Sequence, residues 1–196
     1  ADAPRPTLAA MLARHSGHGP RGIDPLPGPV ALATAERVAG AVGPVPAGGR
    51  LYAALVRVPE RAPGYYVYDP DSGTFLPVTL GAPAARTLFK QFGFQADQCA
   101  MTFFLSADLS QPDWPDSGEP YAGALLACAR AAQRLSWGAA AEGLFARPHL
   151  SHDEPGVDHA LGLTTTAHSA VYAVAVGHDR DRGFPVRLHL PVQESS

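Results

Sequence analysis

The chain has 196 residues, of which 46% are hydrophobic and 17% charged, so it can bury one substantial core. Its net charge of -3 and its single lysine, Lys90, argue against nucleic acid or an anionic membrane as partners, because both need clustered basic residues. We therefore expect one domain over residues 1–196 that binds neither of them.

Apolar spacing and turn residues divide the chain into helices and strands. Thr7 can cap the first helix, and residues 69–73, DPDSG, supply the turn of a clear hairpin. We predict helices at 7–15, 30–42, 82–93 and 121–144, strands at 51–58, 99–108, 169–177 and 185–192, a hairpin over 64–80, and irregular segments at 17–29 and 145–163.

The long helix at 121–144 carries Ala and Leu on almost every face, interrupted only by Arg130, Gln133, Arg134 and Glu142. A helix that is apolar all round is expected in the middle of a protein. Its two central arginines argue against a membrane span. Because no amino-terminal segment resembles a signal peptide, we expect a cytoplasmic protein.

The order of these elements predicts an α+β fold in which a mixed, largely antiparallel sheet packs against the long helix. The glycine fingerprint and regular strand–helix alternation of a dinucleotide-binding fold are missing. Cys99 and Cys128 fall in segments predicted to be buried, where packing is the favoured role and a disulfide is the alternative.

The first candidate site follows the first helix, where Arg14, Ser16 and His18 alternate along the chain. A guanidinium, a hydroxyl and an imidazole at this spacing can all reach one phosphate group. The alternative is a helix end with solvated polar side chains.

Four histidines in the second half of the chain raise the question of a metal. Imidazole is the commonest nitrogen ligand, but no HExxH or Cys/His spacing accompanies them, so we predict no metal site. They are His149, His152, His159 and His168.

The layout of the long helix and the strand after it resembles the core of the nitroreductase-like flavoproteins. The resemblance is carried by Gln133 within the helix, residues 142–144 (EGL) at its exit and residues 176–177 (VG) ending the strand. It is closest to the SagB-type dehydrogenases, which also carry a Pro-Ser-Gly-Gly segment before a Leu-Tyr strand, like residues 44–52 here. The resemblance implies a dimeric nitroreductase-like fold.

The resemblance also implies FMN bound between two protomers, either two copies or two homologous chains. It places a phosphate-binding basic residue just past the core strand, at Arg180 or Arg182, and a flavin-facing loop of the other subunit at Gly48 and Gly49. The implied cofactor-binding residues are Arg14, Ser16, His18, Gly48, Gly49 and Arg180, and Tyr121 is the implied proton-handling residue.

Three departures from the SagB pattern stand beside the resemblance. Ala47 replaces the serine of the glycine loop, residues 114–117 (WPDS) replace a Lys-Tyr pair, and the glycines expected after Leu144 are absent. Asp113, Asp116 and Glu119 are alternative bases in the loop before the helix.

The resemblance implies an FMN-dependent dehydrogenase that oxidises thiazoline or oxazoline rings to azoles in a ribosomally made peptide. The departures favour an alternative, a degenerate nitroreductase fold without flavin that acts as a structural or substrate-binding partner of an active homologue. An ordinary reductase of nitro compounds or quinones is a third reading, weakened by the lack of a basic mouth for a nicotinamide phosphate.

Overall fold

The computed structural model describes residues 6–16, 25–45, 48–90, 96–110 and 120–180. Its helices are α1 (Leu8–Ala13), α2 (Leu32–Gly40), α3 (Ala85–Leu88), the short 3-10 helix η1 (Ala96–Gln98), α4 (Pro120–Ala141) and α5 (Glu154–Ala160). Its strands are β1 (Pro25–Leu26), β2 (Leu51–Leu55), β3 (Gly64–Asp69), β4 (Thr74–Leu80), β5 (Met101–Asp108), β6 (Phe145–His149) and β7 (His168–Asp179).

One sheet organises the molecule, with strand order β1-β7-β5-β2-β3-β4 and with β6 also paired to β7. Every strand pairing in the described part of the chain is antiparallel. β7, with 12 residues, is the longest strand, and it pairs with β5 on one edge and with β1 and β6 on the other. The predicted α+β architecture with a mainly antiparallel sheet is confirmed.

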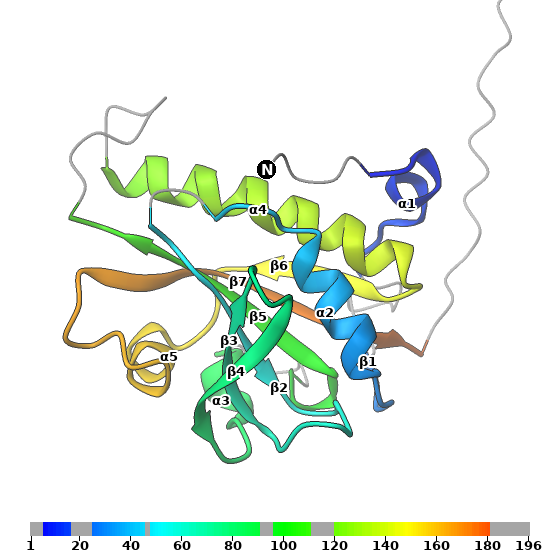
Figure 1. Ribbon diagram of the computed structural model, residues 1–196, viewed down its shortest axis with the longest axis horizontal. Helices are drawn as coiled ribbons and strands as arrows, with labels where there is room; N and C mark the ends of the chain where they lie inside the picture. The colour runs from blue at the N-terminus through cyan, green and yellow to red at the C-terminus, as the bar shows by residue number, and fades with distance from the viewer. Residues whose placement is uncertain (1–5, 17–24, 46–47, 91–95, 111–119, 181–196) are drawn as a thin grey trace, which may run out of the picture.

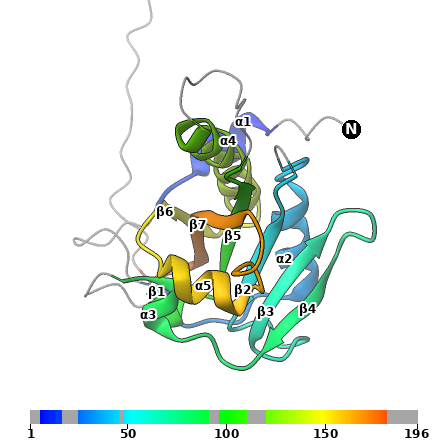
Figure 2. The same ribbon diagram turned by 90° about the vertical axis from the view of Figure 1, so that its left-hand side faces the viewer.

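Helices cover both faces of this sheet. α4 lies across one face with α1 and α2, whereas α3 and α5 cover the opposite face (Figures 1 and 2). Neighbouring residues of β5 show the alternation, since Phe103 packs into the core under α2 and α4 and Phe104 into the core under α3 and α5. Both rings are fully buried.

The two clearest local predictions, the Thr7 cap and the hairpin, are confirmed. Thr7 Oγ1 accepts the backbone N–H of Ala10 at 3.2 Å. In the hairpin turn, the Asp69 carboxylate accepts hydrogen bonds from the Asp71 backbone N–H at 3.1 Å and the Ser72 hydroxyl at 2.5 Å. Gly73 takes the positive φ of 68° that closes such a turn.

The long helix forms as predicted, but its position differs from the prediction. α4 buries a stripe of small and apolar side chains, Ala124, Cys128, Ala131 and Leu135, against the sheet. On its other side Tyr121 is 50% and Leu126 42% exposed, so α4 is an outer layer and not a helix surrounded by protein.

The segment 145–163, predicted to be irregular, contains β6 and α5, so that prediction was wrong. Pro148 lies in β6 opposite Val174. Among the described strands β6 pairs with β7 alone, so the missing N–H of Pro148 is tolerated. Pro155 sits in the first turn of α5, where its lack of an N–H breaks no helical hydrogen bond. Both prolines look like breakers in the sequence and are tolerated here because of where they fall.

Three smaller predictions also differ. The helix expected at 82–93 is helical only over Ala85–Leu88, because Phe89 is extended and the Lys90 N–H bonds the Ser151 carbonyl at 2.6 Å. The strand expected at 51–58 ends at Leu55. Residues 17–29, expected to be irregular, include the short strand β1, while the strand expected at 185–192 lies outside the described residues.

Candidate functional site

The predicted phosphate-binding residues gather where α1 ends. The Ala146 backbone N–H, in β6, donates to the His15 carbonyl at 3.2 Å, which fixes the chain just after α1. The His15 Nδ1 lies 3.8 Å from the carboxylate of Asp179, the last residue of β7. These contacts bring the chain segment of Arg14 and Ser16 beside the end of β7, which Arg180 follows, although the two segments are more than 160 residues apart in sequence.

The donor set in this corner suits a phosphate group. Arg14 and Ser16 are partly exposed and Arg180 is exposed, so two guanidinium groups and a hydroxyl lie at the surface of this part of the molecule. The carboxylate of Asp179, only 7% exposed, adds a negative charge at the same place. His18, the remaining predicted phosphate ligand, lies outside the described residues.

A second predicted group lies around the loop that follows α2. Gly43, with a φ of 65°, turns the chain out of the helix. Arg134, in the middle of α4, then holds the loop, since its Nε donates to the Val42 carbonyl at 2.5 Å and its terminal nitrogen to that of Pro44 at 3.3 Å. Burial lowers the pKa of the Arg134 guanidinium. Sequence reasoning missed this role, although an arginine within an Ala/Leu helix is a signal for a buried partner.

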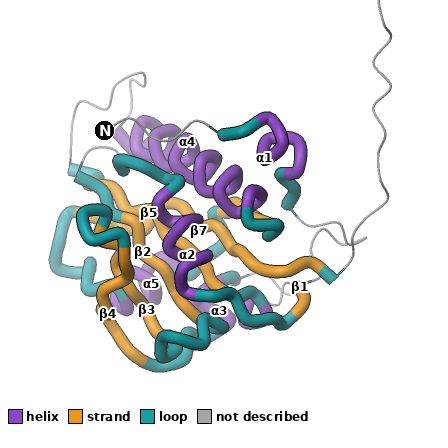
Figure 3. The backbone as a smooth tube through the Cα atoms, turned by 45° about the vertical axis from the view of Figure 1, so that its right-hand side comes forward, coloured by secondary structure: helices purple, strands orange, loops and turns teal. Residues whose placement is uncertain are grey.

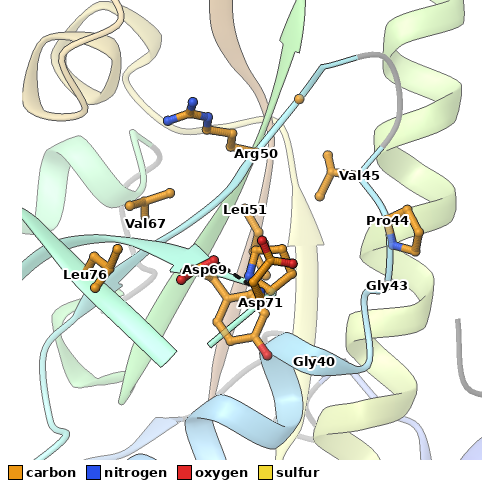
Figure 4. A pocket seen from close by; sticks show the side chains of 13 residues that line it. Gly40, Gly43, Pro44, Val45, Arg50, Leu51, Val67, Asp69, Asp71 and Leu76 are labelled. Carbon is orange, nitrogen blue, oxygen red and sulfur yellow. Dashed lines mark hydrogen bonds between the residues drawn. The ribbon is translucent and has the colours of Figure 1, made fainter. Parts of the chain in front are cut away.

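Gly48 and Gly49, the predicted flavin-facing glycines, follow this loop. Gly48 has a φ of 71°, which favours glycine, and a Cβ there would come within 3.9 Å of the His168 ring. Gly49 lines a cleft of about 840 Å³ between the loop and the β3–β4 hairpin (Figure 4). The cleft is lined by apolar Val45, Leu51, Val67 and Leu76 and by charged Arg50, Asp69 and Asp71.

The cleft opens where β2 and β3 separate. Their pairing runs from Leu55 opposite Gly64 to Tyr52 opposite Val67 and stops there, although β3 continues to Asp69. Beyond this point the two strands form opposite walls of an open slot that begins at Gly49. Such a slot can take an extended chain or a flat ring.

The predicted phosphate-binding residues Arg14, Ser16 and Arg180, called here the phosphate-type corner, and the glycine loop at Gly48 and Gly49 lie at opposite ends of the molecule. Gly48 is beside His168, the first residue of β7, whereas the phosphate-type corner contains Asp179, its last residue. Eleven steps of about 3.3 Å put these ends roughly 36 Å apart. A single chain therefore does not bring the predicted flavin loop and the predicted phosphate residues together.

Tyr121, the predicted proton-handling residue, lies in the first turn of α4 with half of its surface exposed. α4 runs from this end of the sheet to the end of α1, over about 33 Å at 1.5 Å per residue, as Figures 1 and 3 show. Tyr121 thus belongs to the Gly48 end. The alternative bases Asp113, Asp116 and Glu119 lie outside the described residues.

The Glu142 that helped carry the family resemblance is engaged by α2. Arg37 donates to its two carboxylate oxygens at 2.8 and 2.7 Å, a bidentate pair that lowers the pKa of Glu142. This pair fixes the exit of α4 beside α2 and was not predicted. The two residues are 105 positions apart, so no local pattern connects them.

Two of the four histidines pack into the core under α3 and α5. The His152 Nε2 lies 2.7 Å from the Ala170 carbonyl, and the His149 ring packs edge-on against Phe89. Burial, with His152 and Arg147 nearby, lowers the pKa of His149 to about 3. Among the described residues no three His, Cys, Asp or Glu side chains are grouped as metal ligands would be.

The two cysteines are both buried and free. Burial raises the pKa of each thiol to about 12. Cys128 belongs to the buried stripe of α4, and Cys99 packs with Phe145 and Ala175. Packing, the role favoured from the sequence, is what the structure gives them.

Comparison with known proteins supports the fold. No family model and no curated protein matches the sequence. Solved structures do match, and their similarity decides the architecture. The chain has a nitroreductase-like fold.

The structural matches cover most of the chain at low sequence identity. A Ralstonia eutropha JMP134 protein assigned as a nitroreductase gives a TM-score of 0.65 at 14% identity, over 92% of this chain and 87% of that one. A chain of the E. coli microcin synthetase McbBCD complex, solved with truncated pro-MccB17 bound, gives 0.63 at 15%, over 92% and 76%. An FMN-dependent nitroreductase from Clostridium difficile R20291 gives 0.55 at 12%, over 89% and 88%. The structural similarity establishes the nitroreductase-like fold. At identities this low it says nothing about activity, which has to be argued from the residues of the candidate site.

Within the described residues, no helix combines the length and the apolar character that crossing a lipid bilayer requires.

Proposed function

We propose that this chain is an FMN-dependent dehydrogenase of the SagB type, acting as one domain in a pair of protomers. Its proposed reaction is the oxidation of thiazoline or oxazoline rings to azoles in a modified peptide. The nitroreductase-like fold supports the flavin part of the proposal. The likeness to a chain of the McbBCD complex, solved with truncated pro-MccB17 bound, supports a peptide as substrate.

The observation that carries the proposal is the separation of the two residue groups along α4. The phosphate-type corner at Arg14 and Arg180 and the glycine loop at Gly48 lie at opposite ends of this helix. A two-fold axis across the middle of α4 would place the corner of one protomer beside the glycine loop of its partner. One complete flavin site would then form at each end of the pair.

The exposed apolar surface of α1 and α4 supports such a pair. On α1, Leu8 and Leu12 are 70% and 76% exposed and Met11 46%, and on α4 the exposed residues are Tyr121 and Leu126. α1 packs against α4, so these side chains belong to one layer of the molecule (Figure 3). A group of exposed apolar side chains on one layer of a molecule is typical of a protein–protein contact surface.

In the proposed site each residue has one task. Arg14, Ser16 and Arg180, with His18 in the same motif, bind the phosphate of FMN, and the backbone at Gly48 approaches the flavin ring. FMN when bound supplies a hydride acceptor. The Tyr121 phenol oxygen, after giving its own proton to solvent, accepts the proton that the substrate ring loses. The cleft beside Gly49 holds the peptide in an extended form.

A second candidate function is a subunit of the same fold that binds no flavin and supports an active homologue. Asp179 favours it, because a carboxylate that is 7% exposed beside Arg180 opposes a phosphate dianion in the same corner. His15 offsets this charge when protonated, at 3.8 Å from the carboxylate.

The visible spectrum of freshly purified protein separates the two candidates. The flavoenzyme is yellow and releases FMN on denaturation, or takes up added FMN when purified colourless. A protein that remains colourless and binds no added FMN in an equilibrium titration supports the flavin-free subunit. The Tyr121→Phe variant tests the proton-transfer role. If Tyr121 has this role, the variant should still bind FMN but should reduce the flavin more slowly when substrate is added. An unchanged rate would rule the role out.

A further inference from the structure

A second cleft, distinct from the proposed flavin site, lies where the chain leaves β2. It has a volume of about 510 Å³ and is lined by four prolines, Pro27, Pro29, Pro59 and Pro63, and by two arginines, Arg57 and Arg61. We refer to these six residues as the proline–arginine cleft. No residue of the proposed phosphate corner or of the glycine loop lines it.

The two arginines of this cleft have few acceptors among the described residues, and the Nε of each has none. Arg57 is partly buried, its Nε is fully buried without a hydrogen-bond partner, and no ion pair or hydrogen bond engages its side chain within the described residues. The Nε of Arg61 is also buried and unpartnered. Its only contact of this kind is a weak one of 3.4 Å from a terminal nitrogen to Thr74 Oγ1.

Two other arginines in the same molecule show what a satisfied guanidinium looks like. Arg37 forms a bidentate pair with Glu142, and Arg134 donates to two backbone carbonyls. A guanidinium carries five donors, and removing it from water without acceptors is unfavourable. The two arginines of the proline–arginine cleft thus have donors free for an acceptor that the described part of the chain does not supply.

The carboxylates near the cleft each accept a hydrogen bond from a group other than the two arginines. Glu60, between the two arginines in sequence, accepts the backbone N–H of Leu32 at the start of α2 at 3.2 Å. Glu36 accepts the Thr74 hydroxyl at 2.6 Å, and Asp97 accepts from the Gln98 amide at 3.3 Å. No ion pair among the described residues neutralises the two arginines from within.

We propose that the proline–arginine cleft binds an acidic peptide segment through its side-chain carboxylates. Planar guanidinium groups match the planar carboxylate, and flat, rigid proline rings form a preshaped wall against which an extended peptide can lie. A free phosphate is the less favoured ligand. The one glycine of the cleft, Gly28, offers no open approach to its backbone, because a Cβ there would lie 2.9 Å from the His178 ring.

The proposal is tested with two labelled peptides, Ala-Pro-Glu-Pro-Glu-Pro-Ala and the same sequence with Gln in place of Glu. Fluorescence anisotropy of the wild-type protein should show binding of the Glu peptide and at least about 10-fold weaker binding of the Gln peptide, since charge-assisted hydrogen bonds are lost. The side-chain Nε–H signals of Arg57 and Arg61 in ¹⁵N NMR should shift with the Glu peptide. Because the peptide is varied here, this comparison does not depend on whether a protein variant folds.

The protein variants supply the second arm. Arg57→Gln combined with Arg61→Gln should weaken Glu-peptide binding at least about 10-fold, whereas Arg86→Gln, which removes an equal charge from an exposed helix, should leave it unchanged. Equal binding of the two peptides, an equal loss in Arg86→Gln, or displacement of the peptide by inorganic phosphate at matched ionic strength would overturn the proposal. The measurement needs no flavin, so its failure leaves the proposed function untouched.

Discussion

The two faces of the sheet differ in what their helices leave exposed. Under α3 and α5 lies a closed core in which Phe104, Leu88 and Val157 are fully buried and two histidines fill the remaining space. Over the other face, α4 and α1 bury one side and leave large apolar side chains in water on the other. Both groups of predicted site residues lie at the ends of this second layer.

From this difference we propose that the α3/α5 face serves stability and that the α1/α4 layer serves binding. Substitutions under α3 and α5 should lower the free energy of unfolding without changing the affinity of the folded protein for FMN. Substitutions of the charged residues in the proposed phosphate corner should do the reverse. A variant that changes both quantities would break this division.

The largest expected effect is on the closed face. Phe104→Ala removes a fully buried ring that packs against Tyr65 and His152, and should lower the free energy of unfolding by about 3–5 kcal/mol. Urea denaturation followed by circular dichroism measures this. The exposed Leu150→Ala is the control, with a change of less than about 0.5 kcal/mol expected. A weakened FMN affinity of folded Phe104→Ala would contradict the division of the two faces.

Arg14→Gln tests the other side of the comparison. It removes a charged donor from the proposed phosphate corner, so FMN should bind about 10- to 100-fold more weakly, as the loss of a charge-assisted hydrogen bond predicts. Fluorescence titration of apoprotein with FMN gives the dissociation constant. Arg86→Gln is the charge-matched control. Equal FMN affinity in Arg14→Gln and the wild type would remove Arg14 from the site.

A pH titration tests whether the closed face keeps the His149 ring neutral. Burial lowers the pKa of His149 from 6.5 to about 3, so folding favours the neutral ring. As the pH falls, the unfolded chain takes up this proton before the folded protein does. The stability that the neutral His149 ring contributes is therefore complete above pH 6.5 and is lost as the pH falls toward 3. The slope for one proton is about 1.4 kcal/mol per pH unit, or roughly 2 kcal/mol of lost stability at pH 5.

His149→Leu should remove most of this acid sensitivity, because leucine carries no proton. The exposed His159→Gln should leave the pH dependence as in the wild type. Urea midpoints measured between pH 7 and pH 5 compare the three proteins. A His149→Leu curve parallel to the wild-type curve would show that the ring is not held neutral by the fold.

The smallest effect is expected at the glycine loop. Gly48 has a φ of 71°, so Gly48→Ala should lower the free energy of unfolding by about 1 kcal/mol through backbone strain alone. His168, the nearest described group, would be 3.9 Å from the new methyl, so no clash adds to this. Thermal unfolding gives the shift. A melting temperature unchanged by the substitution would mean that the loop adopts another conformation in solution.

The sequence predicted those parts of the fold whose cause is local. Thr7 caps its own helix, Asp69 closes its own turn, and the apolar run after residue 120 forms a helix of the expected length. The prolines of β6 and α5 led to a wrong prediction of irregular structure. A proline is tolerated at the edge of a sheet and in the first turn of a helix, and these two prolines occupy such positions. Only the pairing of β6 with β7 reveals the first of these positions.

In the candidate site, too, the local features could be predicted from the sequence and the contacts between distant residues could not. The spacing of Arg14 and Ser16 is a local motif, but its proximity to Arg180 depends on His15 contacting the last residue of β7. The partners of Arg37 and Arg134 are about 90 to 105 positions away, so a sequence pattern has no means of pairing them. Likewise, the unpartnered state of Arg57 becomes visible only when the carboxylates around it are seen to be engaged elsewhere.

The central claim is that one flavin site is built from two chains, with Arg14 from one protomer and Gly48 from its partner. Mixing two inactive variants, Arg14→Glu and Gly48→Val, tests it most directly. Random exchange makes half of the pairs mixed, and each mixed pair holds one intact site, so about 25% of the wild-type FMN binding should return. No recovery after subunit exchange, with both variants folded and paired, would contradict a site shared between chains.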